Sequence, residues 1–492
     1  MKMHNPLKIS KQSRAILSLL ALASFSHADA QTLADSTKLA TGNHNPILDF
    51  QFTADPTAVE YEGRLYVYGT NDHQQFDSVG VDGKNTYEHI RSLAMMSTDD
   101  MVNWTYHGLI PTGELAPWIM ASWAPSVDKR DEADGKTHFY LYFSNSGYGV
   151  GVLTATSPVG PWTSPLQKSV VDQQTPGLGD CKVPFDPGVV VVNDTLAYLA
   201  FGAGGHSRIA RLGQDMTSIA SDMMTLPTAF LFEANELNYI DSTFVYTYNM
   251  DWSKHEPWNF HGDAPSICCM TYMTSKTPLV TDSWRYEHDY CDNPGLYGMD
   301  YGNNHTHLHK YMGKWYLFNH TQDIQRHHGT TGGFRSMTVD EIEVDEHPLN
   351  IKKVTMTRKG VSQIKALNPY QRVEAETVCA TNNAHFEPSG DAGNMVALVG
   401  SQQTTVINKD LAVLKVSGVD FGKGAKRIKL MLKGKGSVEI RQGSPTGKLL
   451  GKVSANASAW RSSACSLHAK GEQDIVFVLR GKTLMFDYWT CE

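Results

Sequence analysis

The sequence lacks several features that define large classes of proteins. No hydrophobic run reaches the roughly 20 residues of a membrane-spanning helix; the apolar stretch near the N-terminus covers only residues 15–25. Charged residues make up 19% of the chain and the formal net charge is −8, so a broad basic face for nucleic acid is not expected. Residues 43–361 show no sustained helical periodicity, which favours an all-β fold.

Cysteine is also scarce. The chain has seven cysteines, an odd number, and their spacing fits no zinc-binding pattern. Two alternatives remain open. Either the last domain holds a disulfide, as Cys465–Cys491 or one that includes Cys379, or the thiols are free and mostly buried.

The N-terminus has the pattern of an export signal. Basic residues precede the apolar stretch, and Ala28-Asp29-Ala30 follows as a small-x-small cleavage site. Residues 1–30 are therefore predicted to be a signal peptide. We expect a periplasmic or secreted protein with no membrane insertion after cleavage.

Five stretches of the chain repeat one design. Each has a short strand, a polar or Gly-bearing turn, and an aromatic-rich strand, which together indicate a hairpin. The units recur at roughly 50–70 residues, a period typical of a β-propeller. We therefore predict a five-bladed propeller over residues 31–365. The first strands contain Ala54-Asp55-Pro56, Trp123-Ala124-Pro125, Phe185-Asp186-Pro187, Phe232-Glu233-Ala234 and Asn304-His305-Thr306.

A second domain is predicted after a junction near Pro369. The composition changes there, and short alternating strands such as residues 428–432 and 473–479 follow. Residues 366–492 have the length and pattern of a β-sandwich of the jelly-roll type.

Three acids occupy similar points of the repeated units: Asp55, Asp186 and Glu233. Taken singly, an Asp-Pro pair is usually a turn and a strand-end glutamate is usually solvated. Propeller inner strands line one channel, however, so the three are predicted to converge. Carboxylates packed closely push their pKa values apart, as acid/base hydrolysis of a glycosidic bond requires.

These segments resemble glycoside hydrolase family 43, five-bladed propeller enzymes that act on arabinose- and xylose-containing glycans. Phe52-Thr53-Ala54-Asp55-Pro56 resembles the motif of the general base. Phe185-Asp186-Pro187 resembles the motif whose Asp orients the acid and tunes its pKa, and Phe232-Glu233-Ala234 that of the general acid. The resemblance implies an inverting reaction. No Asn-Asp-Pro-Asn motif of retaining, invertase-like propellers is present.

The resemblance also implies further site residues. His305 matches a histidine that reaches a metal ion, usually calcium, in the central channel, and Arg335 matches an arginine that faces the sugar. Glu236 lies close enough to Glu233 to be a rival for the acid. His307 and His309 share a strand face with His305. They either pack and hydrogen-bond in the channel or bind a transition metal.

Trp123 stands where other units carry an acid. It is predicted to form an apolar wall for a sugar face, with a place in the blade core as the alternative. The loops at residues 73–85 and 249–266 are predicted to set specificity, although the second could be an ordinary surface excursion.

The last domain resembles family 6 carbohydrate-binding modules. The similarity lies in its opening stretch, residues 370–376, and in the closing Phe486-Asp487-Tyr488-Trp489. The family implies a second structural calcium, here bound by Glu374 and Glu376, which one strand would place on one face. The alternative is a solvent-facing acidic pair.

The sequence therefore predicts an exported α-L-arabinofuranosidase acting on arabinoxylan or arabinan, with plant polysaccharide as its partner. No obligate protein partner is indicated. The rival predictions are a β-xylosidase or an endo-acting xylanase or arabinanase and, from a different class, a non-catalytic glycan-binding propeller.

Overall fold

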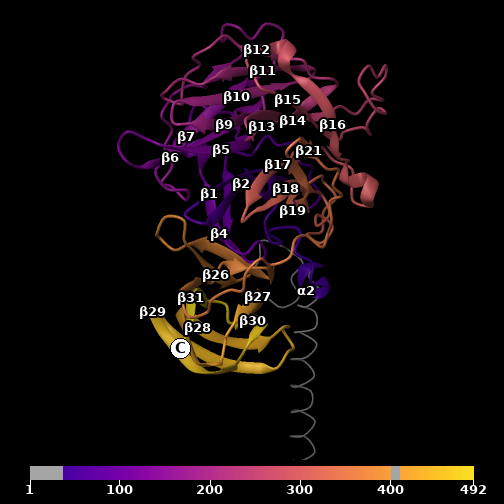
Figure 1. Ribbon diagram of the computed structural model, residues 1–492. Coiled ribbons are helices and arrows are strands. Elements are labelled where there is room, and N and C mark those ends of the chain that lie inside the picture. The colour runs from indigo at the N-terminus through magenta and orange to yellow at the C-terminus, as the bar shows by residue number, and fades with distance from the viewer. Residues whose placement is uncertain (1–36, 401–409) are drawn as a thin grey trace, which may run out of the picture.

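The computed structural model describes residues 37–400 and 410–492, which form two β-rich domains, one above the other in Figure 1. The predicted signal peptide lies outside these residues. No helix in the described part is long and apolar enough to cross a membrane. The helical elements are short: α2 (Thr37–Thr41), α3 (Asp72–Val79), α4 (Thr112–Leu115), η1 (Ser146–Tyr148), η2 (Thr281–Ser283) and η3 (Pro294–Tyr297).

Five antiparallel sheets form the upper domain and confirm the predicted five-bladed propeller. Blade 1 contains β1 (Ala54–Tyr61), β2 (Arg64–Thr70), β3 (Leu93–Thr98) and β4 (Trp104–Ile110). Blade 2 contains β5 (Trp123–Asp131), β6 (Thr137–Ser144), β7 (Gly149–Ala155) and β8 (Val171–Asp172). Blade 3 contains β9 (Gly188–Asn193), β10 (Leu196–Ala203), β11 (His206–Arg211) and β12 (Met224–Leu226).

The last two blades complete the ring. Blade 4 contains β13 (Leu231–Ile240), β14 (Thr243–Met250), β15 (Met270–Ser275) and β16 (Arg285–Cys291). Blade 5 has β17 (His307–Tyr311), β18 (Lys314–Thr321) and β19 (Ser336–Ile342), and a small hairpin of β20 (Val344–Glu346) and β21 (Leu349–Ile351) follows.

The aromatic-rich strands are explained by the packing between blades. Five apolar clusters each join two neighbouring blades, including blade 5 with blade 1. Tyr68, Tyr142 and Tyr248 are fully buried in three of these clusters. Large rings fill the wedge between two sheets, and their burial supplies most of the driving force for closing the ring.

Asn45 closes the ring at the outer strand of blade 5. Its Oδ1 accepts a hydrogen bond of 2.9 Å from the Val339 N–H, and its Nδ2 donates one of 3.0 Å to the Val339 carbonyl. The amide side chain thereby takes the place of a neighbouring strand and satisfies backbone groups that would otherwise be unpaired.

Four inner strands begin with a bulge that the sequence did not reveal. Each bulge holds one residue in the left-handed region: Asp55 (φ 50°), Ala124 (φ 42°), Asp186 (φ 45°) and Ala234 (φ 63°). The N–H of this residue donates to a side chain of the preceding blade, in order His320 Nδ1, Thr70 Oγ1, Ser144 Oγ and Asp186 Oδ2. The repeat is thus a chain of blade-to-blade hydrogen bonds.

The bulges correct one prediction. Glu233 is not at the position equivalent to Asp55 and Asp186. It lies opposite Asn249, directly before the bulge, as Ala54 lies opposite Thr70 in blade 1. Ala234 occupies the left-handed position instead. Trp123, opposite Ser144, shares the register of Glu233.

The lower domain is a sheet of nine strands that folds back on itself around one apolar core, in agreement with the predicted β-sandwich. β28 belongs to both halves, since its first part pairs with β31 and its last part with β30. The strands are β22 (Val373–Glu374), β24 (Ala380–Asn382), β25 (Ala384–Pro388), β26 (Met395–Val399), β27 (Leu411–Asp420), β28 (Ala425–Gln442), β29 (Leu449–Ala469), β30 (Glu472–Arg480) and β31 (Met485–Cys491).

One strand of this segment joins the propeller instead. β23 (Thr377–Val378) pairs with β4 and becomes the fifth strand of the blade 1 sheet. Three residues before the start of β23, Glu374 still pairs with β31. The prediction that Glu374 and Glu376 share one strand face is therefore wrong, because the chain changes partner between them.

All seven cysteines are free thiols. Cys465 and Cys491 both lie opposite Ile428, on the two strands that flank β28. Two inter-strand spacings amount to about 9.5 Å, which exceeds the Cα separation of a disulfide. A Cys465–Cys491 bridge is therefore excluded in this fold.

Candidate active site

The structure brings Asp55, Asp186, Glu233 and His305 together at one end of the propeller channel. Asp55 and Asp186 are buried, and His305 Nδ1 lies 3.6 Å from Asp55 Oδ1 and 3.8 Å from Asp186 Oδ2. The charge of Asp55 acts on the pKa values of both other acids. The three carboxyl groups therefore share one site, as the repeat predicted.

Asp55 is held in its ionised form. Burial alone would raise its pKa, but the charge of Arg335, the neighbouring His320 and His305 and the hydrogen bond from Thr70 outweigh that effect and lower the pKa to about 2. Arg335 Nη1 donates to Oδ1 at 2.8 Å and Thr70 Oγ1 donates to Oδ2 at 2.7 Å. A carboxylate that stays charged at neutral pH can accept a proton from water.

Arg335 is positioned by a second carboxylate. Asp72, at the start of α3, accepts from Arg335 Nε at 2.9 Å and from Nη2 at 2.8 Å. The guanidinium also lies over the Tyr87 ring, 4.8 Å from its centroid. The side chain is 3% exposed, so its fork holds Asp55 in place through a buried, two-sided ion pair.

Glu233 has the opposite electrostatic setting. Burial, with a contribution from the charge of Asp55, raises its pKa to about 7. Its one hydrogen-bond donor here, Asn303 Nδ2, lies 2.8 Å from Oε1 and works against that rise. Glu233 is therefore suited to hold a proton near neutral pH and to donate it.

Asp186 lies close enough to both other acids for their charges to act on it. Burial and the charges of Glu233 and Asp55 raise its pKa. Its oxygens accept from the Ala234 N–H at 2.8 Å and from Ser144 Oγ at 3.3 Å. The first of these bonds fixes the backbone next to Glu233, so Asp186 orients the glutamate as well as repelling its charge.

Two neutral histidines, His305 and His320, lie beside Asp55. Burial lowers the pKa of His305 to about 4 and that of His320 to about 3. His320 Nδ1 accepts from the Asp55 N–H at 3.1 Å, so the proton is on Nε2, which donates to the Asn303 carbonyl at 2.9 Å. The short His–Asp approaches are therefore contacts of neutral rings and not salt bridges.

A separate polar cluster fills the channel below. His307 Nδ1 hydrogen-bonds to Glu236 Oε1 at 2.5 Å, and His307 Nε2 lies 3.3 Å from His309 Nδ1. The two rings stack at 5.4 Å. Glu236 is thus committed to His307, which favours Glu233 as the acid, and the structure supports hydrogen bonding as the role of His307 and His309.

Trp123 lies in an aromatic wall at the mouth of the site. It is half-buried, and its ring meets those of Tyr87 and Phe185 edge-on at 6.1 Å in both cases. Its Nε1 donates to the Tyr87 carbonyl. It is absent from the inter-blade clusters, so the wall prediction fits better than the blade core.

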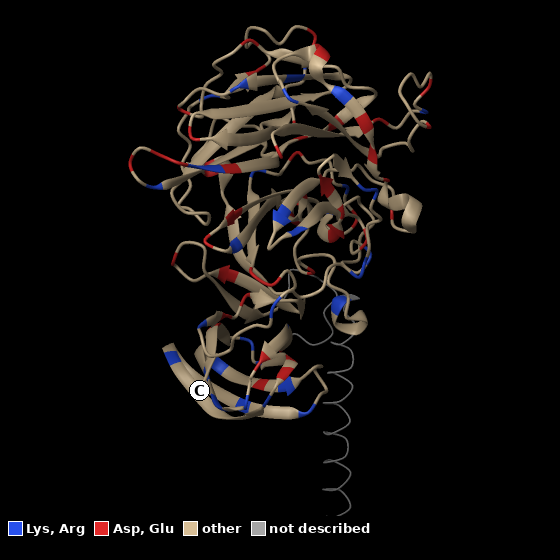
Figure 2. Cartoon of the chain, in the orientation of Figure 1, with Lys and Arg blue, Asp and Glu red and all other residues tan. Residues whose placement is uncertain are grey.

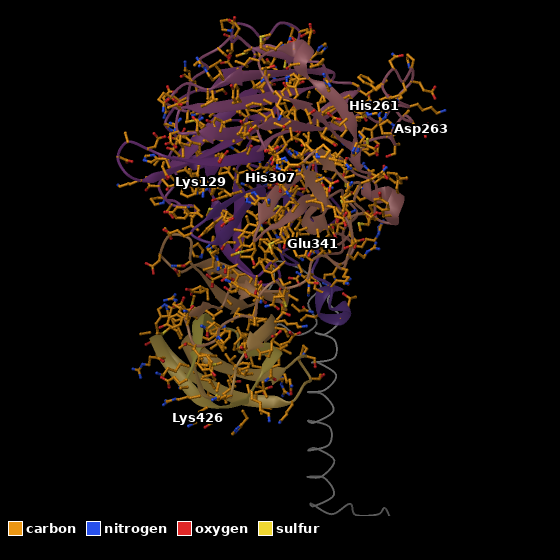
Figure 3. All side chains as sticks on the ribbon, viewed as in Figure 1. Lys129, His261, Asp263, His307, Glu341 and Lys426 are labelled. Atoms are coloured by element: carbon orange, nitrogen blue, oxygen red, sulfur yellow. The ribbon has the colours of Figure 1, made fainter. Side chains whose placement is uncertain are left out.

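The loop at residues 249–266 projects away from this site. Figure 3 shows His261 and Asp263 on an excursion outside the propeller, whereas His307 lies near its centre. Trp258 packs on Phe230 and Tyr286 of blade 4. The loop at residues 73–85, in contrast, contains most of α3 and lies beside the site, because its Asn85 Nδ2 donates to Asp72 Oδ2 at 2.6 Å.

One of the predicted metal ligands, Glu376, has a buried oxygen without a partner. Among residues 37–400 and 410–492, no group of three or more His, Cys, Asp or Glu side chains is arranged to hold a metal ion. Glu376 is fully buried, its Oε1 accepts from the Met395 N–H, and its Oε2 has no partner. Glu374 instead binds Arg372 with both oxygens.

Several site residues were not predicted from the sequence: Asp72, Thr70, His320, Ser144 and Asn303. Thr70 and Ser144 are the last residues of β2 and β6 and lie opposite the bulges of blades 1 and 2, and His320 is the second-last residue of β18 in blade 5. The repeat could have pointed to these residues, because in every hairpin the end of the second strand lies beside the start of the first strand, where the acids are.

Comparison with known proteins agrees with this geometry. The chain matches the family model for glycosyl hydrolases family 43 over residues 43–348 and that for carbohydrate binding module family 6 over residues 374–492. It is 34% identical to an arabinoxylan arabinofuranohydrolase of Bacillus subtilis (strain 168), over 93% of this chain and 94% of that protein. A second such enzyme, from Paenibacillus polymyxa, is 30% identical over 91% of this chain and 74% of its own length.

Solved structures show the same relationship. A family 43 arabinoxylan arabinofuranohydrolase from Bacillus subtilis, solved in complex with cellotetraose, superposes with a TM-score of 0.81 at 32% identity. The match covers 92% of this chain and 98% of that structure, so it spans both domains.

Proposed function

The chain belongs to glycosyl hydrolases family 43, a family of glycoside hydrolases, and we propose that it is an exported α-L-arabinofuranosidase that removes arabinose from arabinoxylan or arabinan. The proposal rests on one observation above all, the pairing of a carboxylate of lowered pKa, Asp55, with a carboxyl of raised pKa, Glu233, in one site. The named relatives, similar over nearly the whole chain, supply the substrate class.

The proposed reaction is a single displacement with inversion. Asp55 takes a proton from a water as that water attacks the anomeric carbon, and Glu233 donates a proton to the leaving oxygen. The bulge offset supports this assignment, since Glu233 approaches the cavity from a different register than Asp55 does. Asp186 holds Glu233 in place, Arg335 keeps Asp55 ionised, and Trp123 supplies an apolar surface for a sugar ring.

We also propose calcium in a supporting role. In the module, the buried Oε2 of Glu376 without a partner fits a hard cation, and Glu374 would have to release Arg372 to join it. In the channel, the neutral ring of His305 fits metal binding, with water as the other ligands. When bound, calcium would supply positive charge and rigidity, and the residues above perform the proton transfers.

The purified enzyme tests the proposal directly. We expect release of arabinose from arabinoxylan and from an aryl α-L-arabinofuranoside, with little action on an aryl β-xyloside. Proton NMR of the first sugar released should show the inverted anomer. Preferred cleavage of the xyloside would point to a β-xylosidase, release of oligosaccharides to an endo-acting enzyme, and glycan binding without turnover to a non-catalytic propeller.

Export is part of the proposal and rests on the N-terminal leader alone. Mass spectrometry of the protein recovered from the periplasm or culture medium should show an N-terminus close to residue 31. An uncleaved protein in the cytoplasm would contradict it.

A further inference from the structure

A second cavity, separate from the carboxylate site, lies where blade 1 meets the C-terminal module. Its volume is about 680 Å³, within the range of small-molecule sites. One wall comes from blade 1 and α3, a second from His327 and His328 after β18, and a third from module residues 381–388. The two domains therefore build this cavity together.

The walls of the cavity are held firmly. β23 pairs with β4 beside it, and Asp49 accepts hydrogen bonds of 2.8 and 2.9 Å from the N–H and hydroxyl of Thr381 across the domain boundary. Asn103 exchanges hydrogen bonds of 2.8 and 2.9 Å with the backbone of Ser417. A site with such fixed walls binds a ligand without first ordering them.

The cavity opens at the same end of the propeller as the catalytic acids. It is lined by Asn71, which follows the last residue of β2, and by Pro111, which follows the last residue of β4. In an antiparallel blade both ends lie beside the start of β1, near Asp55. α3 separates the two sites: Asp72 binds Arg335, and His73 lines the cavity.

The lining combines aromatic rings with hydrogen-bonding groups. Phe50 packs against Tyr106 at 5.3 Å and against Phe386 at 4.7 Å, and all three border the cavity. Leu109 adds an apolar side chain that is 42% exposed. Arg91 donates one hydrogen bond, from Nη2 to the Ile119 carbonyl, out of the five N–H donors of a guanidinium.

The lining carries more carboxyl groups than cations. Asp49, Asp77, Glu114 and Glu387 face one guanidinium, that of Arg91. A phosphate or other anion would be repelled by these carboxyl groups, and a metal ion would find no cluster of ligands among the described residues. Carboxyl oxygens accept hydrogen bonds from hydroxyl groups, so apolar rings beside them suit a neutral polyhydroxy ligand.

We propose that this cavity, the interdomain pocket, binds a short neutral oligosaccharide, as a second glycan site beside the active site. The apolar faces of the backbone sugars would pack on the rings of Phe50, Tyr106 and Phe386. Their hydroxyl groups would donate or accept hydrogen bonds at Arg91, Gln74 and Glu114. The proposal deepens the proposed function, since it assumes that the substrate is a glycan with an extended backbone.

Hydrogen–deuterium exchange of the full chain tests the pocket. The Glu233→Gln variant, which does not turn over, is mixed with linear xylotetraose, a probe without arabinose. We expect slower exchange in residues 106–114 and in residues 381–388. Leu109→Trp in the same background should lose this protection by filling the pocket, whereas Val280→Trp, at a residue that is 52% exposed on blade 4, should retain it.

Each outcome decides the proposal. Absence of protection in residues 106–114 at saturating xylotetraose would overturn it, as would equal protection in Leu109→Trp with a melting temperature like that of Val280→Trp. If Leu109→Trp fails to fold, Leu109→Gln serves as the second variant and should weaken the protection. Arabinose release by the unmodified enzyme is measured separately, and its failure would remove the proposed function without changing the exchange result.

Discussion

The blade 1 and blade 4 sides of the catalytic channel place carboxyl groups in similarly enclosed positions and give them opposite acidity. On the blade 1 side, Arg335 and Thr70 reach Asp55, and its pKa falls to about 2. On the blade 4 side, Glu233 has a single amide donor and no nearby guanidinium bond, and its pKa rises to about 7.

Burial therefore does not decide which acid of this site is the base and which is the proton donor. Burial raises the pKa of both groups, and the placement of one arginine separates them. The pH profile has a clear sign. Asp55 must be ionised and Glu233 protonated, so kcat/KM should fall as the pH rises through about 7 and should stay high on the acid side until the fold or Asp55 titrates.

The largest effect should come from removing either half of the pair. Asp55→Asn and Glu233→Gln should each lower kcat by about 10²–10⁴-fold or more, because a positioned general base or acid is lost. Circular dichroism and the melting temperature should show that the fold persists. Near-normal hydrolysis by Asp55→Asn would end its assignment as the base. Glu236→Gln, a matched change outside the pair, should leave the alkaline limb in place.

Replacing Arg335 with a residue that binds Asp55 less well should bring the pKa of Asp55 closer to that of Glu233. Arg335→Lys keeps a charge but loses the fork that spans Asp55 and Asp72. The pKa of Asp55 should rise, so the acid limb of kcat/KM should move to higher pH, and kcat should fall by about tenfold or more, a cost of about 1.4 kcal/mol. Asp72→Asn leaves Arg335 beside Asp55. An equal shift of the acid limb in both variants would argue against a direct role of the guanidinium.

A substitution on the blade 4 side, at Asn303, should have a smaller effect on activity. Asn303 stabilises the ionised form of Glu233, so Asn303→Ala should raise the pKa of Glu233 further and move the alkaline limb to higher pH. The expected loss in kcat is several-fold, since a typical hydrogen bond contributes about 1 kcal/mol net. A downward shift of the limb would show that Asn303 acts in another way.

The smallest effect concerns the module and its own buried acid. Chelation of calcium should lower the melting temperature by a few degrees, because a ligand at 100 times its Kd contributes about 2.7 kcal/mol. Glu376→Gln removes the negative charge of the buried carboxyl group and should weaken the response to calcium. If the unmodified chain responds no more than Glu376→Gln does, the module site is wrong.

The two domains also differ in how far their sequences predicted them. In the propeller, alternating aromatic strands and turns follow a period-2 pattern, so the blades and the convergence of the three acids on one site were predicted, whereas their catalytic roles stay a prediction. The bulges were not predicted, because a left-handed Ala124 or Ala234 has no residue signature of its own and is maintained by a hydrogen bond that its N–H donates to a side chain of the preceding blade. Asp72 and His320 were missed for the same reason.

The module was predicted from its resemblance to a known family, and one local prediction, the shared strand face of Glu374 and Glu376, is wrong. Glu374 and Glu376 are two residues apart, which on a single strand would place them together. β4 offers an open edge at that point, and β23 pairs with it instead. An unpaired strand edge is costly to leave exposed, so the propeller draws the strand away from the sandwich.

The sequence alone determined the local properties: strands, turns, the repeat and the number and kind of acids, since each depends on neighbouring residues in the chain. The tertiary structure decided which acid is charged, which strand completes blade 1 and where the two domains enclose a pocket. These depend on groups such as Asp55 and Arg335 that are 280 positions apart and meet only when the ring closes.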